Sequence, residues 1–193
     1  MQVRVAMLLI SLGLMVGCKK ESTNAAGTES APAATASTAK LTVTSSALTE
    51  GQPMPKAYAC NDEKHRDTSP PLAWTKGPEG TEFYAIEMLD LDAPNVPNAW
   101  DKETKNFLHW RLLNVPPTVL SIAPSTMPPP NTGIGVENHF GTPVYGGPCP
   151  PPGAPAHHYT ITVYAMKKKQ PINTSIAKAD VLASGTLTVT YAR

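Results

Sequence analysis

Two aspartates separated by a single residue are the first side chains in this sequence that could carry chemistry. Asp90 ends the run 82–90, and Asp92 follows it and leads into Ala93 and Pro94. Residues i and i+2 of an extended chain point to the same side, so we expect the two carboxylates to lie close together. Such a pair could bind a metal, act as acid and base, or hold a histidine protonated. The same spacing is also typical of a solvated turn before proline, and that alternative stays open.

Two histidines lie in runs that could bring them to these carboxylates. His109 stands among core-forming residues, which predicts either a hydrogen-bonded core histidine or the floor of a pocket. His157 and Tyr159 share one face at the start of the last long apolar run, whereas His158 points to the other face. His157 is therefore the histidine that we expect in a binding site.

The stretch before His157, residues 145–156, is rich in glycine and proline. Proline fixes the backbone and removes N–H donors, so the N–H groups of Gly146 and Gly147 are expected to face a ligand as an anion-binding nest. A solvated proline-rich spacer is the alternative. A spacer would not explain why the stretch ends in a histidine and a tyrosine that share one face.

Three kinds of site could use these groups. A metal hydrolase could take Asp90, Asp92, His109 and His157 as ligands, but their spacing matches no strong zinc signature. A nucleophilic enzyme would need a serine or cysteine beside a base, and the sequence contains no G-x-S-x-G elbow. An anion site needs only imidazole, tyrosine hydroxyl and backbone N–H groups, so it requires the fewest further assumptions.

Apolar residues that alternate with polar ones, or that fill both faces of a run, predict the strands that would position these groups. The predicted strands cover residues 41–47, 82–90, 107–114, 159–166 and 186–191. Twenty-one prolines separate the runs and exclude long helices, although one short helix is predicted from Ser175 to Ser184. The sequence therefore predicts a mainly β protein, an antiparallel β-sandwich with one or two short helices.

The beginning of the chain predicts secretion. Residues 1–17 contain an apolar run that is too short to span a bilayer, as in a signal peptide. Residues 14–18 (LMVGC) resemble the bacterial lipobox, so Cys18 is expected to become the lipidated first residue, with an ordinary signal peptide as the alternative. Residues 18–39 are rich in small and polar residues and predict a flexible tether, which leaves 40–193 as one domain.

Charge and cysteine count narrow the partners and the compartment. Removal of the signal peptide would leave equal numbers of basic and acidic residues, because it contains Arg4 and no acid. A neutral chain has no electrostatic footprint for nucleic acid, so no nucleic-acid partner is expected. With Cys18 committed to lipid, Cys60 and Cys149 remain. In an oxidising compartment they predict a disulfide, with two buried free thiols as the alternative.

Short motifs occur in a fixed order along the domain. They are SPPLAW (69–74), DLDAP (90–94), LHW (108–110), NVP (114–116), YGGPCPPPG (145–153) and HHYTITVYA (157–165). In this order they resemble the phosphatidylethanolamine-binding protein family, in its bacterial, Raf kinase inhibitor-like branch. The resemblance implies a β-sandwich with a small surface pocket for anions such as phosphate, acetate or a phospholipid head group.

The resemblance also implies which residues form the pocket. By position they would be Asp90, Asp92, His109, Gly147, Pro148, His157 and Tyr159. The chain departs from the family pattern at Leu91, where many members carry proline, and at His158, where arginine is common. The loop 95–106 has no residue-by-residue counterpart in the family pattern.

The expected function is a non-catalytic periplasmic lipoprotein that binds small anions or phospholipid head groups without a cofactor. In this hypothesis, His109 and His157 donate to the anion, and the backbone of Gly146 and Gly147 completes the cradle. A module that inhibits a protease or kinase by binding it is the alternative, and a weak hydrolase is a third reading. Lys19 stands where enteric inner-membrane lipoproteins carry aspartate, so the outer membrane, facing the periplasm, is the expected location.

Replacement of the predicted lipidation site tests the anchor. We expect Cys18→Ala to move the protein from the membrane fraction to the soluble fraction, because a single residue carries the acyl chains. Cell fractionation followed by flotation measures the distribution, with Cys60→Ala as a control that keeps the lipidation site. A Cys18→Ala protein that still floats with membranes would contradict the anchor.

Overall fold

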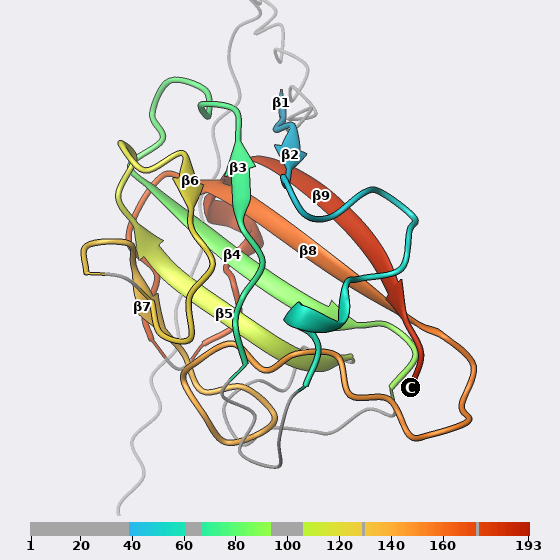
Figure 1. Cartoon of the computed structure of the whole chain (residues 1–193). Helices are drawn as coiled ribbons and strands as arrows, with labels where there is room; N and C mark the ends of the chain where they lie inside the picture. Colours follow the sequence, from blue (N-terminus) through green and yellow to red (C-terminus); the bar gives the residue numbers. More distant parts are fainter. Residues whose placement is uncertain (1–38, 61–66, 94–105, 129, 173) are drawn as a thin grey trace, which may run out of the picture. The chain divides into compact units, whose positions relative to one another are not determined.

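Two β-sheets form the body of the protein. The computed structural model describes residues 39–60, 67–93, 106–128, 130–172 and 174–193; the predicted signal peptide, and the tether except residue 39, lie outside them. The larger sheet has the strand order β1-β9-β8-β4-β5-β7 and the smaller one has the order β2-β3-β6 (Figure 1). The prediction of a mainly β sandwich is confirmed.

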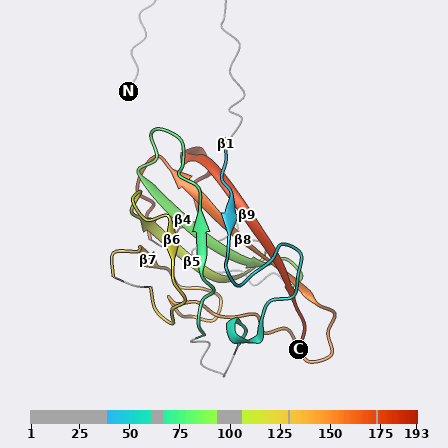
Figure 2. The same ribbon diagram turned by 45° about the horizontal axis from the view of Figure 1, so that its top comes forward.

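The strands of the larger sheet come from both ends and the middle of the domain. They are β1 (Ala39–Lys40), β4 (Phe83–Asp90), β5 (Phe107–Val115), β7 (Ile134–Gly135), β8 (His157–Met166) and β9 (Val181–Tyr191). The smaller sheet contains β2 (Val43–Thr44), β3 (Leu72–Trp74) and β6 (Ser121–Ile122). All pairings between these strands are antiparallel except that of β1 with β9, which is parallel and visible in Figure 2.

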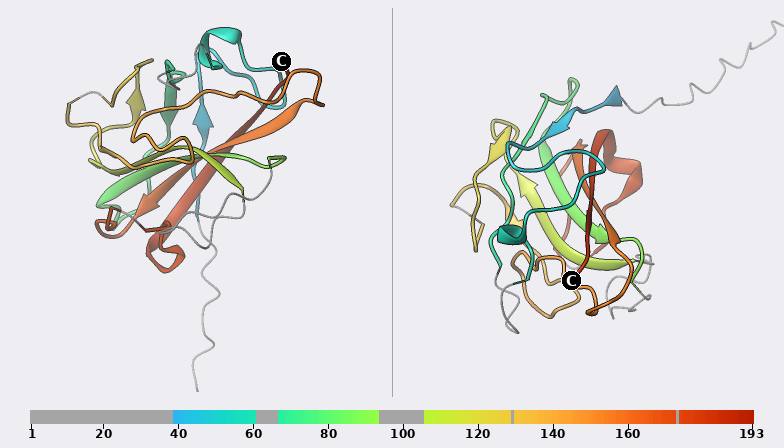
Figure 3. Two further views of the ribbon diagram at one scale, coloured as in Figure 1. Left: turned by 90° about the horizontal axis from the view of Figure 1, so that it is seen from below. Right: turned by 45° about the vertical axis from the view of Figure 1, so that its right-hand side comes forward.

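The main core lies between the two sheets, whose separate layers are visible in Figure 3. The smaller sheet contributes Leu72 and Trp74, and the larger sheet contributes apolar residues from its long strands, all of which are buried. The opposite face of the larger sheet is also covered: Leu113 and Met166 are buried there with Val136. Burial on both faces explains why apolar residues fall on both faces of β4 and β5 rather than on one face only.

A buried ion pair crosses the two central strands β4 and β5. Glu87 and Arg111 are register partners, and the Arg111 Nε donates to Glu87 Oε2 at 2.7 Å. Only 1% of Arg111 and 7% of Glu87 are exposed. A pair of this kind is costly to break from one side, because a single buried charge would remain.

The predicted helix from Ser175 to Ser184 is wrong for most of its length. The structure has a short 3-10 helix, η2 (Lys178–Asp180), and β9 begins directly after it at Val181. Pairing of β9 along the whole of β8 stabilises the extended chain and overrides the weak local helix signal. Gly185 is a strand residue rather than a helix cap. A side chain there would lie 2.2 Å from the carbonyl oxygen of Leu41.

The other differences are smaller. The predicted strand 41–47 is reduced to Val43–Thr44, because the Ser45 Oγ accepts from the N–H groups of Ala47 and Leu48 and turns the chain. A second 3-10 helix, η1 (Lys56–Tyr58), precedes the first cysteine of the domain. Within the described ranges, no helix has the length and apolar content needed to cross a bilayer.

A disulfide connects η1 to the proline-rich stretch before β8. Cys60 and Cys149 are bonded, with their Cα atoms 5.4 Å apart and a sequence separation of 89. The Cys60 N–H also donates to the carbonyl of Pro148 at 3.1 Å, so covalent and hydrogen bonds join the same two segments. The Arg193 Nη1 lies 3.1 Å from the Cys149 Sγ.

Loss of this disulfide is expected to destabilise the domain substantially. A loop of this length lowers the entropy of the unfolded chain, which stabilises the fold by at most about 4 to 5 kcal/mol. Chemical denaturation of the Cys60→Ser/Cys149→Ser variant against wild type measures the change. Treatment with a reductant should reduce the stability of wild type toward that of the variant. Equal denaturation midpoints for the two oxidised proteins would contradict a structural role for the bond.

Candidate functional site

The ends of three adjacent strands bring the predicted residues together. Asp90, the last residue of β4, pairs with Tyr159 of β8 on one side and with Phe107 of β5 on the other. His109 stands two residues after Phe107, and His157 stands two residues before Tyr159. The period of two along each strand therefore places both histidines beside the same carboxylate.

Asp90 is the centre of the site. Its Oδ1 accepts from the backbone N–H groups of Asp92 at 2.9 Å and Ala93 at 3.0 Å, which turns the chain at the end of the strand. Its Oδ2 accepts from the His157 Nδ1 at 2.7 Å. Only 3% of the residue is exposed. Three hydrogen bonds thus fix the carboxylate in one orientation, as a buried charge requires.

His109 is a buried, neutral histidine at neutral pH. Its Nδ1 donates to the carbonyl oxygen of Gly146 at 2.9 Å, and its Nε2 lies 3.9 Å from the Asp90 Oδ2. Burial lowers the pKa of His109 to about 4, although the Gly146 carbonyl and the Asp90 carboxylate act in the opposite direction. The expectation that this ring donates to an anion is therefore corrected: near neutral pH its Nε2 carries a lone pair.

Tyr159 brings a hydroxyl group into the same cluster. Its ring stacks on His157 with centroids 6.4 Å apart, and it meets the edge of His109 at 5.2 Å. The hydroxyl is buried, and the Asp90 carboxylate lies close enough to accept a hydrogen bond from it. Burial, and next the charge of Asp90, raises the pKa of Tyr159. The group therefore remains protonated and can donate.

A cavity of about 240 Å³ opens beside these groups. Its lining comprises Asp90, Ala93, Phe107, His109, Phe140, Cys149, Pro150, Pro151 and His157. Most of the wall is apolar, and the ionisable side chains are one carboxylate and two imidazoles. Within the described ranges, no group of three or more His, Cys, Asp or Glu side chains is arranged to hold a metal ion. The chemistry of the cavity is therefore that of a proton-bearing, partly apolar binding site.

The two glycines before the wall do not form the expected nest. The Gly146 N–H donates to the carbonyl of His109 at 3.1 Å, and the Gly147 N–H donates to the Asp67 Oδ2 at 2.8 Å. Both donors are thus used inside the protein, so the prediction that they face a ligand is corrected. Gly147 is required for packing instead, since a side chain there would lie 2.5 Å from the Ala59 carbonyl carbon. Pro148 is buried with them, and the cavity wall begins at Cys149.

Asp92 does not join Asp90 in the cavity. The strand ends at Asp90, so the same-side rule for extended chains no longer applies to Asp92. Its Oδ2 instead accepts from the backbone N–H of His158 at 2.6 Å and from that residue's Nδ1 at 2.8 Å. These bonds, the backbone one first, lower the pKa of Asp92. The pair is exposed, and it lies outside the cavity lining.

Several residues that shape the cavity were not predicted from the sequence. Phe107 and Phe140 form its aromatic side, with ring centroids 4.9 Å apart. Asn138 holds Phe140 in place: its side-chain amide donates to the carbonyls of His109 and Val144, and its oxygen accepts from the Phe140 N–H at 3.0 Å. Phe107 and Phe140 are distant in sequence, so no local sequence pattern indicates that they meet. The loop 95–106, whose contacts could not be predicted, lies outside the described residues except for residue 106.

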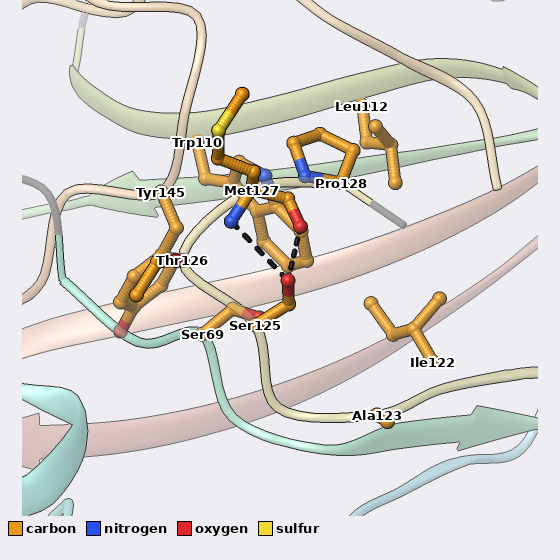
Figure 4. Close-up of a pocket in the computed structure, with 10 residues that line it drawn as sticks. All are labelled: Ser69, Trp110, Leu112, Ile122, Ala123, Ser125, Thr126, Met127, Pro128 and Tyr145. Atoms are coloured by element: carbon orange, nitrogen blue, oxygen red, sulfur yellow. Dashed lines mark hydrogen bonds between the residues drawn. The ribbon is translucent and has the colours of Figure 1, made fainter. Parts of the chain in front are cut away.

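A second hollow, between the sheets, is too small for a ligand. Its volume is about 10 Å³, and Trp110, Ile122 and Tyr145 are among the side chains that surround it (Figure 4). Ser125 closes one side, where its hydroxyl group is hydrogen-bonded to the backbone N–H and carbonyl of Met127. A space of this size holds about one water molecule, so it is a packing gap and not a candidate site.

The β-sandwich and the cavity at the ends of β4, β5 and β8 define a ligand-binding class of protein, and the sequence comparisons specify the family. The phosphatidylethanolamine-binding protein family matches residues 44–192. The crystal structure of Escherichia coli YbcL, described as a new member of the mammalian PEBP family, superposes with a TM-score of 0.67. The two share 27% sequence identity over 80% of this chain and 99% of YbcL. The chain belongs to the phosphatidylethanolamine-binding protein family.

Two mycobacterial relatives are similar in sequence. A UPF0098 protein of Mycobacterium tuberculosis is 35% identical over 132 residues, which are 68% of this chain and 57% of that protein. The putative lipoprotein LppC of the same species is 32% identical over 126 residues, which are 65% of this chain and 55% of LppC. This chain thus matches little more than half the length of each mycobacterial protein.

The low pKa of His109 predicts a loss of stability in acid. An unfolded histidine takes up a proton near pH 6.5, whereas the folded ring does so only near pH 4. Because the unfolded state binds more protons between these values, the free energy of unfolding falls as the pH drops through this window. We expect this residue to contribute a decrease of about 2 to 3 kcal/mol between about pH 7.5 and pH 4.5.

Denaturation curves of wild type and His109→Asn across this range measure the contribution. Asparagine keeps a donor for the Gly146 carbonyl but does not titrate, so the variant should lose much less stability in acid. Identical pH profiles for the two proteins would show that His109 does not account for the acid sensitivity.

Proposed function

We propose that this protein is a non-catalytic binding protein that holds a small oxyanion, such as phosphate or a phospholipid head group, in the cavity beside Asp90. The observation that carries the proposal is the pairing of one fixed carboxylate with two imidazoles in an apolar-walled cavity. The buried Tyr159 hydroxyl is a further donor in the same cluster, where it lies close to the Asp90 carboxylate.

The size of the cavity supports a small ligand. A volume of 240 Å³ is smaller than the roughly 300 to 1,000 Å³ of pockets that enclose drug-sized ligands. Phosphate or phosphoethanolamine fits within this limit, whereas an acyl chain would have to remain outside.

Binding is favoured over catalysis by the state of the groups in the wall. Cys149, the one thiol-bearing residue of the lining, is bonded to Cys60 and cannot serve as a nucleophile. His109 is held neutral by burial, with a pKa well below the range that suits a general base near pH 7. The fixed orientation of Asp90 and its two histidines suits recognition of a ligand that is not changed.

We further propose that the domain is displayed from the outer membrane into the periplasm by a lipid on Cys18. The support is the lipobox-like sequence at residues 14–18 and the resemblance to a relative named a putative lipoprotein. A tether of residues 18–39 would separate the domain from the bilayer, which leaves the cavity open to soluble ligands and to lipid head groups.

Removal of the His157 ring should weaken anion binding. A hydrogen bond to a charged group is worth about 1.5 to 3 kcal/mol, so His157→Ala should raise the Kd for phosphate and phosphoethanolamine by about 10- to 100-fold. Isothermal titration calorimetry near pH 6 measures both ligands. The matched control is His158→Ala, which removes the neighbouring exposed ring outside the cavity and should leave the Kd unchanged.

Two results would count against the proposal. If wild type binds neither ligand, the cavity has another role, and the protein-inhibitor hypothesis gains support. If His157→Ala and wild type bind equally well, the anion is held elsewhere on the surface.

A further inference from the structure

The ring nitrogens that face the protein determine what the cavity can offer a ligand. A carbonyl oxygen only accepts, so the bond between the His109 Nδ1 and Gly146 places the proton of the neutral ring on Nδ1. The Nε2 of this ring, which lies toward Asp90, then has a lone pair and no hydrogen. At His109 the cavity therefore presents an acceptor.

The second imidazole is oriented in the same way. The His157 Nδ1 lies 2.7 Å from the Asp90 Oδ2, so Nδ1 carries the shared proton and Nε2 is again the remaining nitrogen. This Nε2 can donate only when the ring holds a second proton. Both imidazoles thus become donors to an anion only after proton uptake.

The other side chains of the lining do not make up for these missing donors. Pro150 and Pro151 have no N–H group, and Phe107 and Phe140 bring apolar rings. The nearby glycine N–H groups already donate to His109 and Asp67. Among these side chains, an oxyanion without a proton would therefore face the negative charge of Asp90 and the lone pair of His109.

We infer that the cavity binds its oxyanion together with one proton, and that its preferred ligand class is a phosphate monoester or hydrogen phosphate rather than a phosphodiester. The inference rests on the proposed function and narrows it. A monoester retains an ionisable P–OH group near neutral pH, which can donate to the Nε2 of an imidazole or to the Asp90 carboxylate. No covalent bond changes: the proton comes from solvent and lies between a ligand oxygen and a ring nitrogen.

The charged groups around the two imidazole rings favour, on balance, the uptake of this proton into the cavity. His109 faces the Asp90 carboxylate from β4 and the Tyr159 ring from β8, and His139 lies close enough to act on its charge. Asp90 stabilises a proton in the cavity, whereas His139, when charged, opposes it. Around His157, the carboxylates of Asp90 and Asp92 face the ring from the end of β4, and Tyr191 of β9 is its register partner.

Proton exchange is measured directly by calorimetry in buffers of different ionisation enthalpy. Near pH 8, where a phosphate monoester is a dianion, binding of phosphoethanolamine should take up about one proton per site. Its Kd should rise by about tenfold for each pH unit above the pKa that governs the proton, between about pH 6.5 and pH 8.5. The variant His158→Gln should show the same uptake, because that ring pairs with Asp92 outside the cavity.

A phosphodiester distinguishes the two places where the proton can reside. Glycerophosphoethanolamine has no ionisable P–OH group near neutral pH. Much weaker binding of this ligand than of phosphoethanolamine places the proton on the ligand oxygen. Comparable binding with similar proton uptake places it on an imidazole and overturns the preference for monoesters.

The failure of this inference and the failure of the proposed function give different results. Binding of phosphoethanolamine with no proton uptake, and with one Kd from pH 6.5 to 8.5, overturns the inference and leaves the binding function intact. Absence of binding across the whole pH range overturns both. His157→Gln gives a further check, because an amide donates without titrating. If the His157 ring holds the proton, proton uptake should fall in this variant. Glycerophosphoethanolamine should then bind the wild type about as well as phosphoethanolamine does.

Discussion

The bond between Asp90 and His157 is the contact on which the rest of the candidate site depends. It joins the end of β4 to the start of β8, and it occupies the carboxylate oxygen that also faces His109. The carboxylate is in turn held by two backbone N–H groups of the turn that follows it. One buried charge therefore orients the His157 ring and faces the His109 ring, whose orientation is fixed by its hydrogen bond to the Gly146 carbonyl.

Two side chains outside the cavity support the site through hydrogen bonds to the backbone. Asp67, which is fully buried, receives the N–H of Gly147, and Asn138 ties the carbonyl of His109 to the Phe140 segment. Neither side chain lines the cavity among the described residues. Their role is to bring the glycine- and proline-rich wall and the aromatic side into register with the strand ends, which a rigid binding site requires.

Residue periodicity could predict the parts of the site that lie within strands. His157 and Tyr159 share a face in the structure because β8 is regular there, and the strands β4, β5, β8 and β9 lie where apolar patterning placed them, although β9 begins earlier. The same rule misplaced Asp92, because the strand ends at Asp90, two residues before it. It also could not exclude a helix before β9, since the decisive pairing partner, β8, is a separate segment of the chain. The glycine N–H groups were misassigned for a related reason: Asp67, the acceptor of one of them, lies 80 residues away.

The disulfide between Cys60 and Cys149 makes part of the cavity wall a product of chemical maturation. Cys149 lines the cavity directly, and the two segments are otherwise joined by hydrogen bonds from Cys60 to the Pro148 carbonyl and from Tyr145 to the Tyr58 carbonyl. In a compartment that keeps thiols reduced, the chain would therefore fold with a less constrained wall. At the proposed periplasmic location, oxidation would give the cavity its final dimensions, so that affinity for the proposed ligand would be gained there rather than at the site of synthesis.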